Sequence, residues 1–134
     1  MKTTHRLLVV FAAALMLIAS TGCAKLKARD QLNKGVQAYK NAKYEQAIDH
    51  FQKAVALDPT LINARLYLAT AFAQQYIPGA DTPDNNKYAE QAIDQYKLVL
   101  KADPKNINSV KGIAYLYLQM KKFDLAKEYY KKAS

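Results

Sequence analysis

One short pattern occurs three times in this sequence and sets the spacing of the residues around it. Each copy has an alanine, an aromatic residue four positions later, and a small or β-branched residue three positions after that. The copies are Ala47, Phe51 and Ala54; Ala92, Tyr96 and Val99; and Ala126, Tyr130 and Ala133. Steps of three and four residues place all three positions on one face of a helix, so the pattern predicts a repeated helical unit.

The residues between these copies are also typical of helices. From Ala28 onward the chain is rich in Ala, Leu, Lys, Gln and Tyr, with apolar residues three and four positions apart and no competing strand pattern. A single helical hairpin cannot bury both of its faces, whereas stacked hairpins can. The sequence therefore predicts one all-α domain of stacked antiparallel helical hairpins.

The repeated segments resemble the tetratricopeptide repeat (TPR), a unit of about 34 residues that folds into two antiparallel helices. The resemblance is carried by Gly35 and Tyr39, and by the segments 44–59, 91–104 and 123–133. It implies a right-handed superhelix of three repeats in a TPR domain over 28–134. The repeats are expected at about 28–61, 62–106 and 107–134, the third incomplete at the C-terminus.

The resemblance also implies separate packing roles for small and aromatic residues. Small residues are expected where two helices of one hairpin cross closely: Gly35, Ala69 and Ala114. Aromatic residues are expected to fill the gap to the next hairpin: Phe51, Tyr96 and Tyr130. Three positions depart from the family pattern, in which Trp, Leu and a small residue are usual: Gln31, Lys34 and Val99.

The second repeat carries an insertion, because its copy of the pattern follows the first by 45 residues instead of 34. Turn-forming residues place the extra segment in a loop near 75–86. Thr82 suits a helix N-cap and Pro83 the first helical position, so we expect the second helix to begin near Pro83. Such insertions often lie on a binding face. The loop has an apolar tip, and the sequence leaves open whether it binds or is a tolerated surface insertion: Tyr76, Ile77 and Pro78.

The N-terminus reads as a secretion signal over residues 1–22. Lys2 and Arg6 precede an apolar run over 7–18, which is followed by the small or short residues 20–22. A membrane-spanning helix needs about 20 apolar residues, and this run is shorter. Cleavage after residue 22 leaves 112 of the 134 residues, enough for one domain.

Cys23 is the only cysteine and directly follows this signal. The segment Ser20-Thr21-Gly22-Cys23 resembles the lipobox of bacterial lipoproteins, which implies lipidation of Cys23 and a short lipidated tether over 23–27. A soluble periplasmic protein with a free thiol is the other reading. In the lipoprotein family, Ala24 at the next position implies sorting to the outer membrane, facing the periplasm. Four extended residues reach about 14 Å at most, so we expect the first hairpin to lie close to that membrane.

Removing Lys2 and Arg6 with the signal lowers the net charge from +9 to +7. A basic chain raises the question of nucleic acid, but export and the lack of a nucleic-acid motif predict no such partner. Nine of the lysines lie in residues 97–134. A solvated face is one reading of them; binding of an anionic envelope glycan or lipid headgroup is the other, through Lys121, Lys122, Lys131 and Lys132.

Three carboxylate pairs have the four-residue spacing that would suit acid and base catalysis: Glu45 and Asp49, Glu90 and Asp94, Asp124 and Glu128. They recur with the repeat, which favours solvated outer-face acids instead. His50 is the only histidine beyond residue 22, so no metal cluster or nucleophilic dyad is expected. The isolated Gly79 and Gly112 form no phosphate loop. We therefore expect neither an enzyme nor a cofactor.

The family resemblance implies a binding groove on the concave face, lined by the first helix of each hairpin. Carried over position by position, it predicts these partner-binding residues: Arg29, Asn33, Tyr39, Lys40, Asn63, Tyr67, Gln74, Asn108, Lys111, Tyr115 and Gln119. Amides and tyrosines suit an extended peptide or a helix, because amides pair with its backbone and aromatic rings supply contact area. The expected function is a protein-binding scaffold.

Some TPR proteins hold an acidic chaperone tail with a clamp of Lys and Asn residues. The clamp positions here carry other residues in part: Leu32, Val36, Tyr67, Asn108 and Gly112. A chaperone tail is therefore not the expected partner. At the other end of the chain, Leu125 and Tyr129 are expected to stay uncovered, which predicts further repeats or self-association there.

Overall fold

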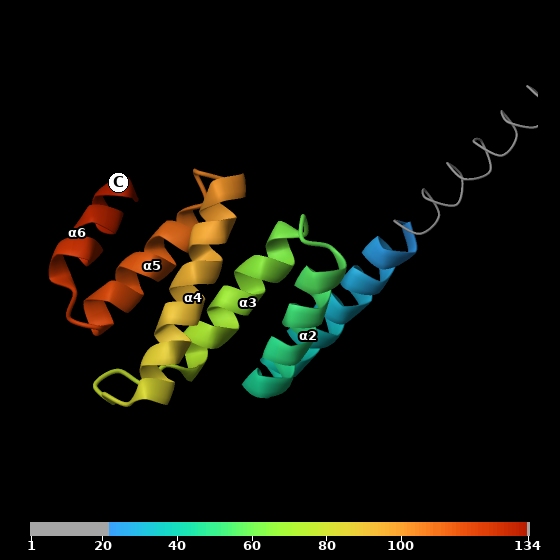
Figure 1. Ribbon diagram of the computed structural model, residues 1–134, viewed down its shortest axis with the longest axis horizontal. Helices are drawn as coiled ribbons and strands as arrows, with labels where there is room; N and C mark the ends of the chain where they lie inside the picture. The colour runs from blue at the N-terminus through green and yellow to red at the C-terminus, as the bar shows by residue number, and fades with distance from the viewer. Residues whose placement is uncertain (1–21, 134) are drawn as a thin grey trace, which may run out of the picture.

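The computed structural model describes residues 22–133, which form three antiparallel helical hairpins (Figure 1). A helix over residues 22–40 pairs with α2 (Tyr44–Leu57), α3 (Ile62–Gln75) with α4 (Pro83–Ala102), and α5 (Ile107–Gln119) with α6 (Phe123–Lys132). No strand occurs among the described residues, and the all-α prediction is confirmed. Residues 1–21 of the predicted signal over 1–22, with Ser20 and Thr21 of the lipobox, lie outside the described residues, as does Ser134.

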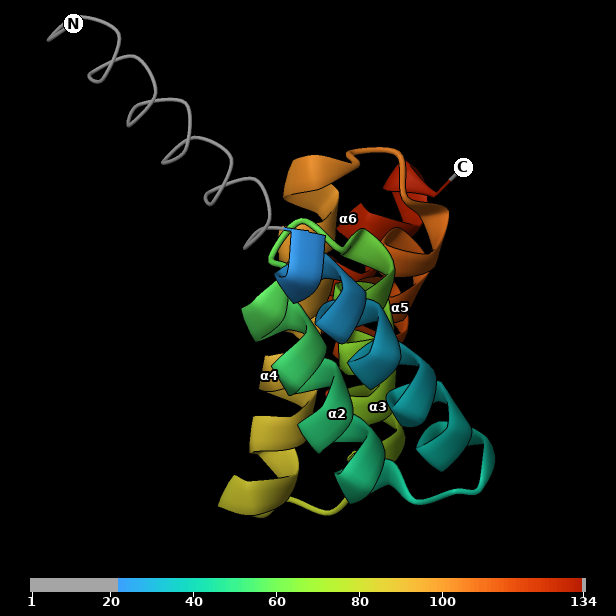
Figure 2. The same cartoon turned by 90° about the vertical axis from the view of Figure 1, so that its right-hand side faces the viewer.

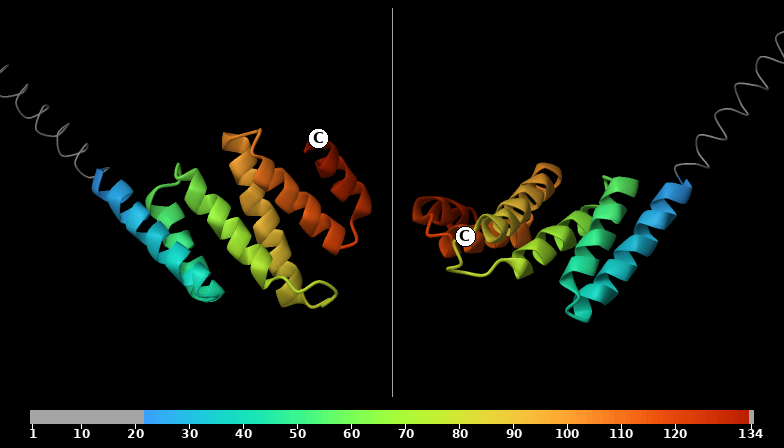
Figure 3. Two further views of the ribbon diagram at one scale, coloured as in Figure 1. Left: turned by 180° about the vertical axis from the view of Figure 1, so that it is seen from behind. Right: turned by 60° about the horizontal axis from the view of Figure 1, so that its bottom comes forward.

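The hairpins stand side by side in a row, with the N-terminal hairpin at one end and α6 at the other (Figures 1 and 3). Helix α3 packs against α2 and α4, and it also contacts α5, its counterpart in the next hairpin. The second helices α2 and α4 make no such contact with each other. The first helices of the hairpins therefore lie on the inner side of the row, and the second helices lie on the outer side.

The two ends of the helices form two edges of the row (Figure 2). One edge holds residue 22, the turns at 58–61 and 103–106, and the C-terminal end of α6; we call it the amino end. The other edge holds the turns at 41–43 and 120–122 and the inserted loop at 76–82; we call it the loop end. The antiparallel order of the six helices dictates this division.

Aromatic side chains of the second helices fill the gaps between hairpins, as predicted. Phe51 is fully buried, and its ring stacks on Tyr67 of α3 with centroids 5.5 Å apart. Gly35 makes room for it, because a Cβ there would lie 2.5 Å from the ring. Tyr96 is 5% exposed, whereas Tyr130, in the last helix of the described row, is 43% exposed. Burial of the aromatic ring thus follows from the presence of a hairpin beside it.

The inserted loop and the helix after it agree with the prediction. Helix α4 begins at Pro83, and the Thr82 hydroxyl accepts a hydrogen bond from the Asn85 amide at 3.3 Å. This is the N-cap geometry that satisfies a backbone N–H at a helix start. Proline at the first helical position costs nothing, because its missing N–H would have no partner there.

The start of the first helix differs from the expectation. We expected a helix from near Ala28 after a tether, but the described helix already covers residues 22–40. The residues 24–27 are Ala, Lys, Leu and Lys, which are all strong helix formers, and they extend the helix by one turn. A helix rises only 1.5 Å per residue, so this segment brings the domain closer to Cys23 than an extended tether would.

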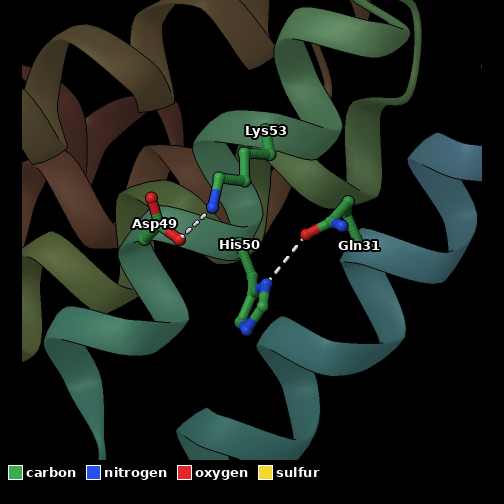
Figure 4. Close-up of polar contacts among 4 residues, drawn as sticks. All are labelled: Gln31, Asp49, His50 and Lys53. Carbon is green, nitrogen blue, oxygen red and sulfur yellow. Dashed lines mark hydrogen bonds and ion pairs between the residues drawn. The ribbon is translucent and has the colours of Figure 1, made fainter.

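Two polar contacts on the first hairpin are drawn in Figure 4. His50 of α2 donates from Nδ1 to Gln31 Oε1 of the first helix at 2.8 Å, because an amide oxygen can only accept. The prediction of an ordinary surface histidine was thus incomplete, since His50 is half-buried and joins two helices. Asp49 and Lys53 form an exposed ion pair at 2.6 Å, four residues apart.

The last helix also departs from expectation in one residue. Leu125 is 40% exposed, as expected, but Tyr129 is half-buried. Its ring lies against Tyr117 of α5 with centroids 5.8 Å apart, and the Lys132 ammonium lies 4.6 Å from its centre. The sequence could not show that α6 turns this ring toward its own hairpin.

Candidate inner-face binding site

A hollow of about 250 Å³ opens on the inner face between α3 and α5. We call it the inner hollow. It is lined by residues from four segments: Thr70, Ala73, Gln74, Tyr76, Pro78, Tyr96, Gly112 and Tyr115. None of these side chains carries a charge at neutral pH, and four of them bear a hydroxyl group. A ligand here would meet hydrogen-bonding groups and aromatic surface.

Gly112 lets the Tyr96 ring reach the inner hollow. In the register of the repeats it occupies the position of Tyr67, 45 residues earlier. Tyr67 stacks on the preceding aromatic residue, Phe51, whereas Tyr96 packs directly against Gly112. A Cβ at residue 112 would lie 2.6 Å from Cζ of Tyr96 and 3.0 Å from its hydroxyl. Glycine therefore allows the buried Tyr96 ring to lie between α4 and α5, where it lines the inner hollow.

The hydroxyl groups in the inner hollow have defined roles. Thr70 donates to the Leu66 carbonyl at 2.9 Å, and its Oγ1 lies 3.2 Å from the Tyr96 hydroxyl. Since the only hydroxyl hydrogen of Thr70 is donated to Leu66, Tyr96 must be the donor in the second contact. The Tyr96 oxygen keeps its acceptor capacity. Burial raises the pKa of Tyr96 above its ordinary value, which already leaves the hydroxyl protonated at neutral pH.

Tyr39 extends the site to the first hairpin. Its pKa is raised, chiefly by burial and then by the neighbouring Tyr44, while the nearby Gln74 side chain partly opposes the shift. The rings of Tyr39 and Tyr44 meet edge to face, with centroids 5.3 Å apart. Tyr39 is half-buried and Gln74 is exposed. Tyr39 thus places a half-buried tyrosine of the first hairpin near Gln74, a residue that lines the inner hollow.

The inserted loop forms one wall of the inner hollow. Tyr76 is 9% exposed and lines the hollow together with Pro78. The loop is held by Asn85, whose Nδ2 donates to the carbonyls of Ile77 at 2.8 Å and Ala80 at 2.6 Å. Its Oδ1 accepts from the Ile77 amide at 2.7 Å. The inserted loop is therefore a fixed part of the wall of the inner hollow.

The predicted groove residues are distributed over the inner face and both of its ends. Gln74 and Tyr115 line the inner hollow, and Tyr39 and Tyr67 lie on the helices beside it. Gln119 instead lines a separate cleft of about 370 Å³ between the inserted loop and the turn at 120–122. The remaining six are exposed, in the first helix or in the first turns of α3 and α5: Arg29, Asn33, Lys40, Asn63, Asn108 and Lys111.

Sequence reasoning missed Tyr96 as a member of the site. It lies on a second helix and was assigned only to packing between hairpins. One signal was available, because the same position is Phe51 in the first copy, and a buried tyrosine hydroxyl usually has a partner. Tyr76 and Pro78 were noticed in the loop, but nothing in the sequence placed them beside α5.

The positions of the chaperone-tail clamp look different from a charged site. Leu32 and Val36 are half-buried and pack against the core, so they present no cation to the inner face. Tyr67 stacks on Phe51, and Gly112 lines the inner hollow. A ligand carboxylate would therefore lack ion-pair partners at these positions.

The acidic and basic residues singled out by sequence are on the surface. All six residues of the carboxylate pairs are exposed, and Glu128 pairs with Lys132 at 2.7 Å. Lys121 and Lys122 lie at the loop end, whereas Lys131 and Lys132 lie at the amino end, on opposite ends of α6. These four lysines therefore do not form one surface. The described residues contain no cluster of acids, Cys and His able to hold a metal ion.

Comparison with known protein families agrees with this arrangement. The tetratricopeptide repeat family matches residues 28–61, the first hairpin, and residues 112–134, which cover most of the third. The chain is a tetratricopeptide repeat protein. No curated protein gives a significant match to the sequence.

Solved structures similar to this TPR chain include two TPR domains and the protein MamA. The first TPR of Spaghetti (RPAP3), bound to the HSP90 peptide SRMEEVD, is 20% identical over 81% of this chain and 78% of its own, with a TM-score of 0.68. The Arabidopsis OM64 TPR domain is 16% identical, with 82% of each chain covered and a TM-score of 0.70. A structure of MamA is 26% identical, with a TM-score of 0.65, over 79% of this chain and 55% of its own.

Proposed function

We propose that this TPR protein is a non-enzymatic scaffold of the bacterial envelope, exported and anchored to the outer membrane by lipid on Cys23. On its inner face it binds a peptide or helix of another protein. The observation that carries this proposal is the inner hollow, where the Tyr96 oxygen can accept further hydrogen bonds and Tyr115 is 50% exposed. TPR domains are protein-interaction modules, and a similar TPR in Spaghetti (RPAP3) is bound to a peptide.

The chemistry of the inner hollow favours a neutral ligand segment. Its lining has no charged side chain, so hydrogen bonds and aromatic contacts supply the affinity. Because Tyr96 presents an acceptor, the ligand group that enters the hollow is a hydrogen-bond donor, such as a backbone N–H or a side-chain amide. The peptide in the Spaghetti structure, SRMEEVD, has three acidic residues. This chain has no matching clamp, so its partner differs from that peptide.

A photo-crosslinking amino acid at Tyr115, in the protein within its own envelope, tests the inner face. The matched control carries the same group at Gln52, which is exposed on the outer face. We expect one partner to be captured at Tyr115 and identified by mass spectrometry, and not to be captured at Gln52. The partner segment should then lose affinity for the Tyr39→Ala, Tyr67→Ala and Tyr115→Ala variants. Equal capture at both positions, or unchanged affinity in all three variants, would count against the proposal.

Mass spectrometry of the protein extracted from membranes tests the anchor. We expect an N-terminal peptide that starts at Cys23 and carries acyl groups, and we expect Cys23→Ser to release the protein from the membrane fraction. Cys23 is exposed and on the first turn of the described helix, which leaves its sulfur accessible. No described helix is long and apolar enough to cross a bilayer. An unmodified thiol in the mature protein would contradict the lipid anchor.

A further inference from the structure

A second hollow, of about 490 Å³, lies at the amino end of the row, beside α6. Its walls are Leu100 and Pro104 from the end of α4 and the turn after it, Ile107 and Val110 from α5, and the ring of Tyr129. Lys105 and Lys132 complete the lining, and both are exposed. We call it the lysine-rimmed hollow, because two cationic side chains share its lining with the apolar walls.

The apolar walls are accessible from outside. Ile107 is 42% exposed, and Leu100 and Tyr129 are half-buried, while only Val110 is sealed at 5%. Lys132 lies 4.6 Å from the centre of the Tyr129 ring and 2.7 Å from a Glu128 oxygen. Glu128 neutralises part of that charge, so Lys105 is the stronger of the two cations. Contact between water and the exposed apolar walls is unfavourable. The hollow therefore suits a ligand with an apolar part that covers the walls and an anionic end that meets the lysines.

An outer hollow between the first and second hairpins has no such rim. It measures about 300 Å³ and is lined by neutral or acidic polar residues around an apolar floor: Gln52, Val55, Ala56, Leu68, Phe72, Gln91, Asp94 and Gln95. Both hollows separate consecutive second helices of the repeat. The lysines are therefore a property of the second hollow and not of the repeat geometry.

The whole amino end is basic. Its basic side chains come from the first turns of the first helix, the ends of α4 and α6 and the turn between α4 and α5: Lys25, Lys27, Arg29, Lys101, Lys105, Lys131 and Lys132. Four acidic residues lie among them, and two of these are already paired with lysines: Asp30, Asp58, Asp103 and Glu128. The pKa of Asp58 is lowered, first by its Thr60 hydrogen bond and then by the charges of Lys25 and Arg29. Positive charge thus surrounds the turn at 58–61.

The geometry points to the amino end as a membrane-docking surface for anionic phospholipid, with the lysine-rimmed hollow taking an acyl chain below its headgroup. This inference rests on the proposed anchor, because Cys23 is in the first turn of the helix over 22–40, and that helix starts at the same end of the row (Figure 2). The first helix runs without a break from residue 22 to residue 40, so an anchored Cys23 brings this edge to the bilayer. Basic clusters beside a lipid anchor are attracted by anionic leaflets.

A phospholipid fits the hollow better than an anionic glycan does. Both could satisfy the lysines, but a sugar polymer has no long apolar chain to cover Leu100, Ile107 and the Tyr129 ring. The anchor alone would hold the protein at the membrane in any orientation that its linkage permits. The basic, partly apolar edge selects the orientation in which the amino end faces the lipid and the loop end faces away.

The test uses the processed protein, purified from membranes and reconstituted into two sets of vesicles. One set is phosphatidylethanolamine with about a quarter phosphatidylglycerol, and the other is neutral phosphatidylcholine. An environment-sensitive dye is attached to Asn108→Cys at the amino end or, as a control, to Lys43→Cys at the loop end; both positions are exposed. Flotation with the vesicles measures the anchor, and the dye spectrum measures the orientation.

We expect the dye at residue 108 to report an apolar environment in anionic vesicles and water in neutral ones, while the dye at residue 43 reports water in both. Lys105→Gln with Lys132→Gln should reduce the response at residue 108 by roughly half or more, as should about 0.5 M NaCl. Lys121→Gln with Lys122→Gln is the matched control at the loop end and should change nothing. Ile107→Ser should also weaken the response, because it removes an apolar wall.

Three results would overturn the inference. One is a dye at residue 108 that stays in water on anionic vesicles although the protein floats, in which case the anchor stands and the docking surface does not. Another is a response that is the same in the two Lys→Gln pairs. The third is a response to a soluble anionic polysaccharide and not to vesicles, which would assign the edge to a glycan. Protein that floats with neither set of vesicles contradicts the anchor and the docking surface together.

Discussion

Gly35→Ala sets two known effects against each other. Gly35 lies inside the helix over 22–40, where alanine is favoured over glycine by about 1 kcal/mol of helix propensity. A Cβ at residue 35 would, however, lie 2.5 Å from Cδ1 and Cε1 of Phe51, far inside van der Waals contact. Phe51 is fully buried and stacks on Tyr67, so its ring has no free direction in which to move. Overpacking of this kind costs about 1–3 kcal/mol. The expected net effect is destabilisation by up to about 2 kcal/mol.

Urea unfolding followed by circular dichroism measures this change, with Phe51→Leu and the double variant completing the cycle. Phe51→Leu alone should destabilise, because it removes buried ring carbons. In the double variant the clash is relieved, so the double variant should be more stable than the sum of the single changes predicts, by about 1–3 kcal/mol. If Gly35→Ala instead stabilises the protein by about 1 kcal/mol, only helix propensity acts at this position, and the expected clash with Phe51 does not occur.

Further predictions concern the turns and the last helix. Asn85→Ala removes three hydrogen bonds to the inserted loop. The variant should lose about 1–3 kcal/mol of stability in urea unfolding, and its loop should be cleaved faster by protease. An unchanged cleavage rate would show that Asn85 does not hold the loop. Ala42 and Lys121 have φ of 57° and 60°, so each change to glycine should stabilise by up to about 1 kcal/mol, and a loss of stability would refute the strain. The pKa of Glu128 is lowered by its hydrogen bond to Lys132. Its small stabilising effect should therefore be present at pH 7 and lost as the pH falls below the ordinary glutamate range, so that Glu128→Gln and the parent protein unfold alike at pH 3.

The hairpin architecture could be predicted because it depends on local rules. Helical spacing, the residues that suit an N-cap and the repeat length each act over a few residues or one repeat. Thr82 and Pro83 therefore placed the start of α4 correctly, after an insertion whose length followed from the repeat spacing alone. The start of the first helix was misplaced because Ala24 to Lys27 were interpreted through the lipoprotein resemblance and not through their own helix propensity.

The site depends on contacts between repeats, which no local rule supplies. Gly112 has no motif of its own, and its effect appears only when Tyr96 of the preceding hairpin lies against it. Tyr96 is the donor to Thr70 because the Thr70 hydroxyl already donates to the Leu66 carbonyl. This assignment needs the distance between a residue of α3 and a residue of α4, which the sequence does not provide. The sequence grouped Lys121 and Lys122 with Lys131 and Lys132 as one binding surface, but the ten-residue helix α6 lies between the two pairs and is about 15 Å long.

The inserted loop and the basic amino end lie at opposite edges of the row, so each would face a different partner. Asn85 fixes the inserted loop at the loop end, where Tyr76 walls the inner hollow on one side and lines the cleft beside Lys121 on the other. On the proposed anchoring, the amino end is occupied by lipid, so a partner reaches the inner face from the loop end and meets this wall first. Shortening the loop should then slow partner association more than moving a charge at the amino end does, because the loop lies on the only edge that faces away from the bilayer. Equal effects of the two changes on the association rate would contradict the proposed orientation while leaving the inner hollow as the binding site.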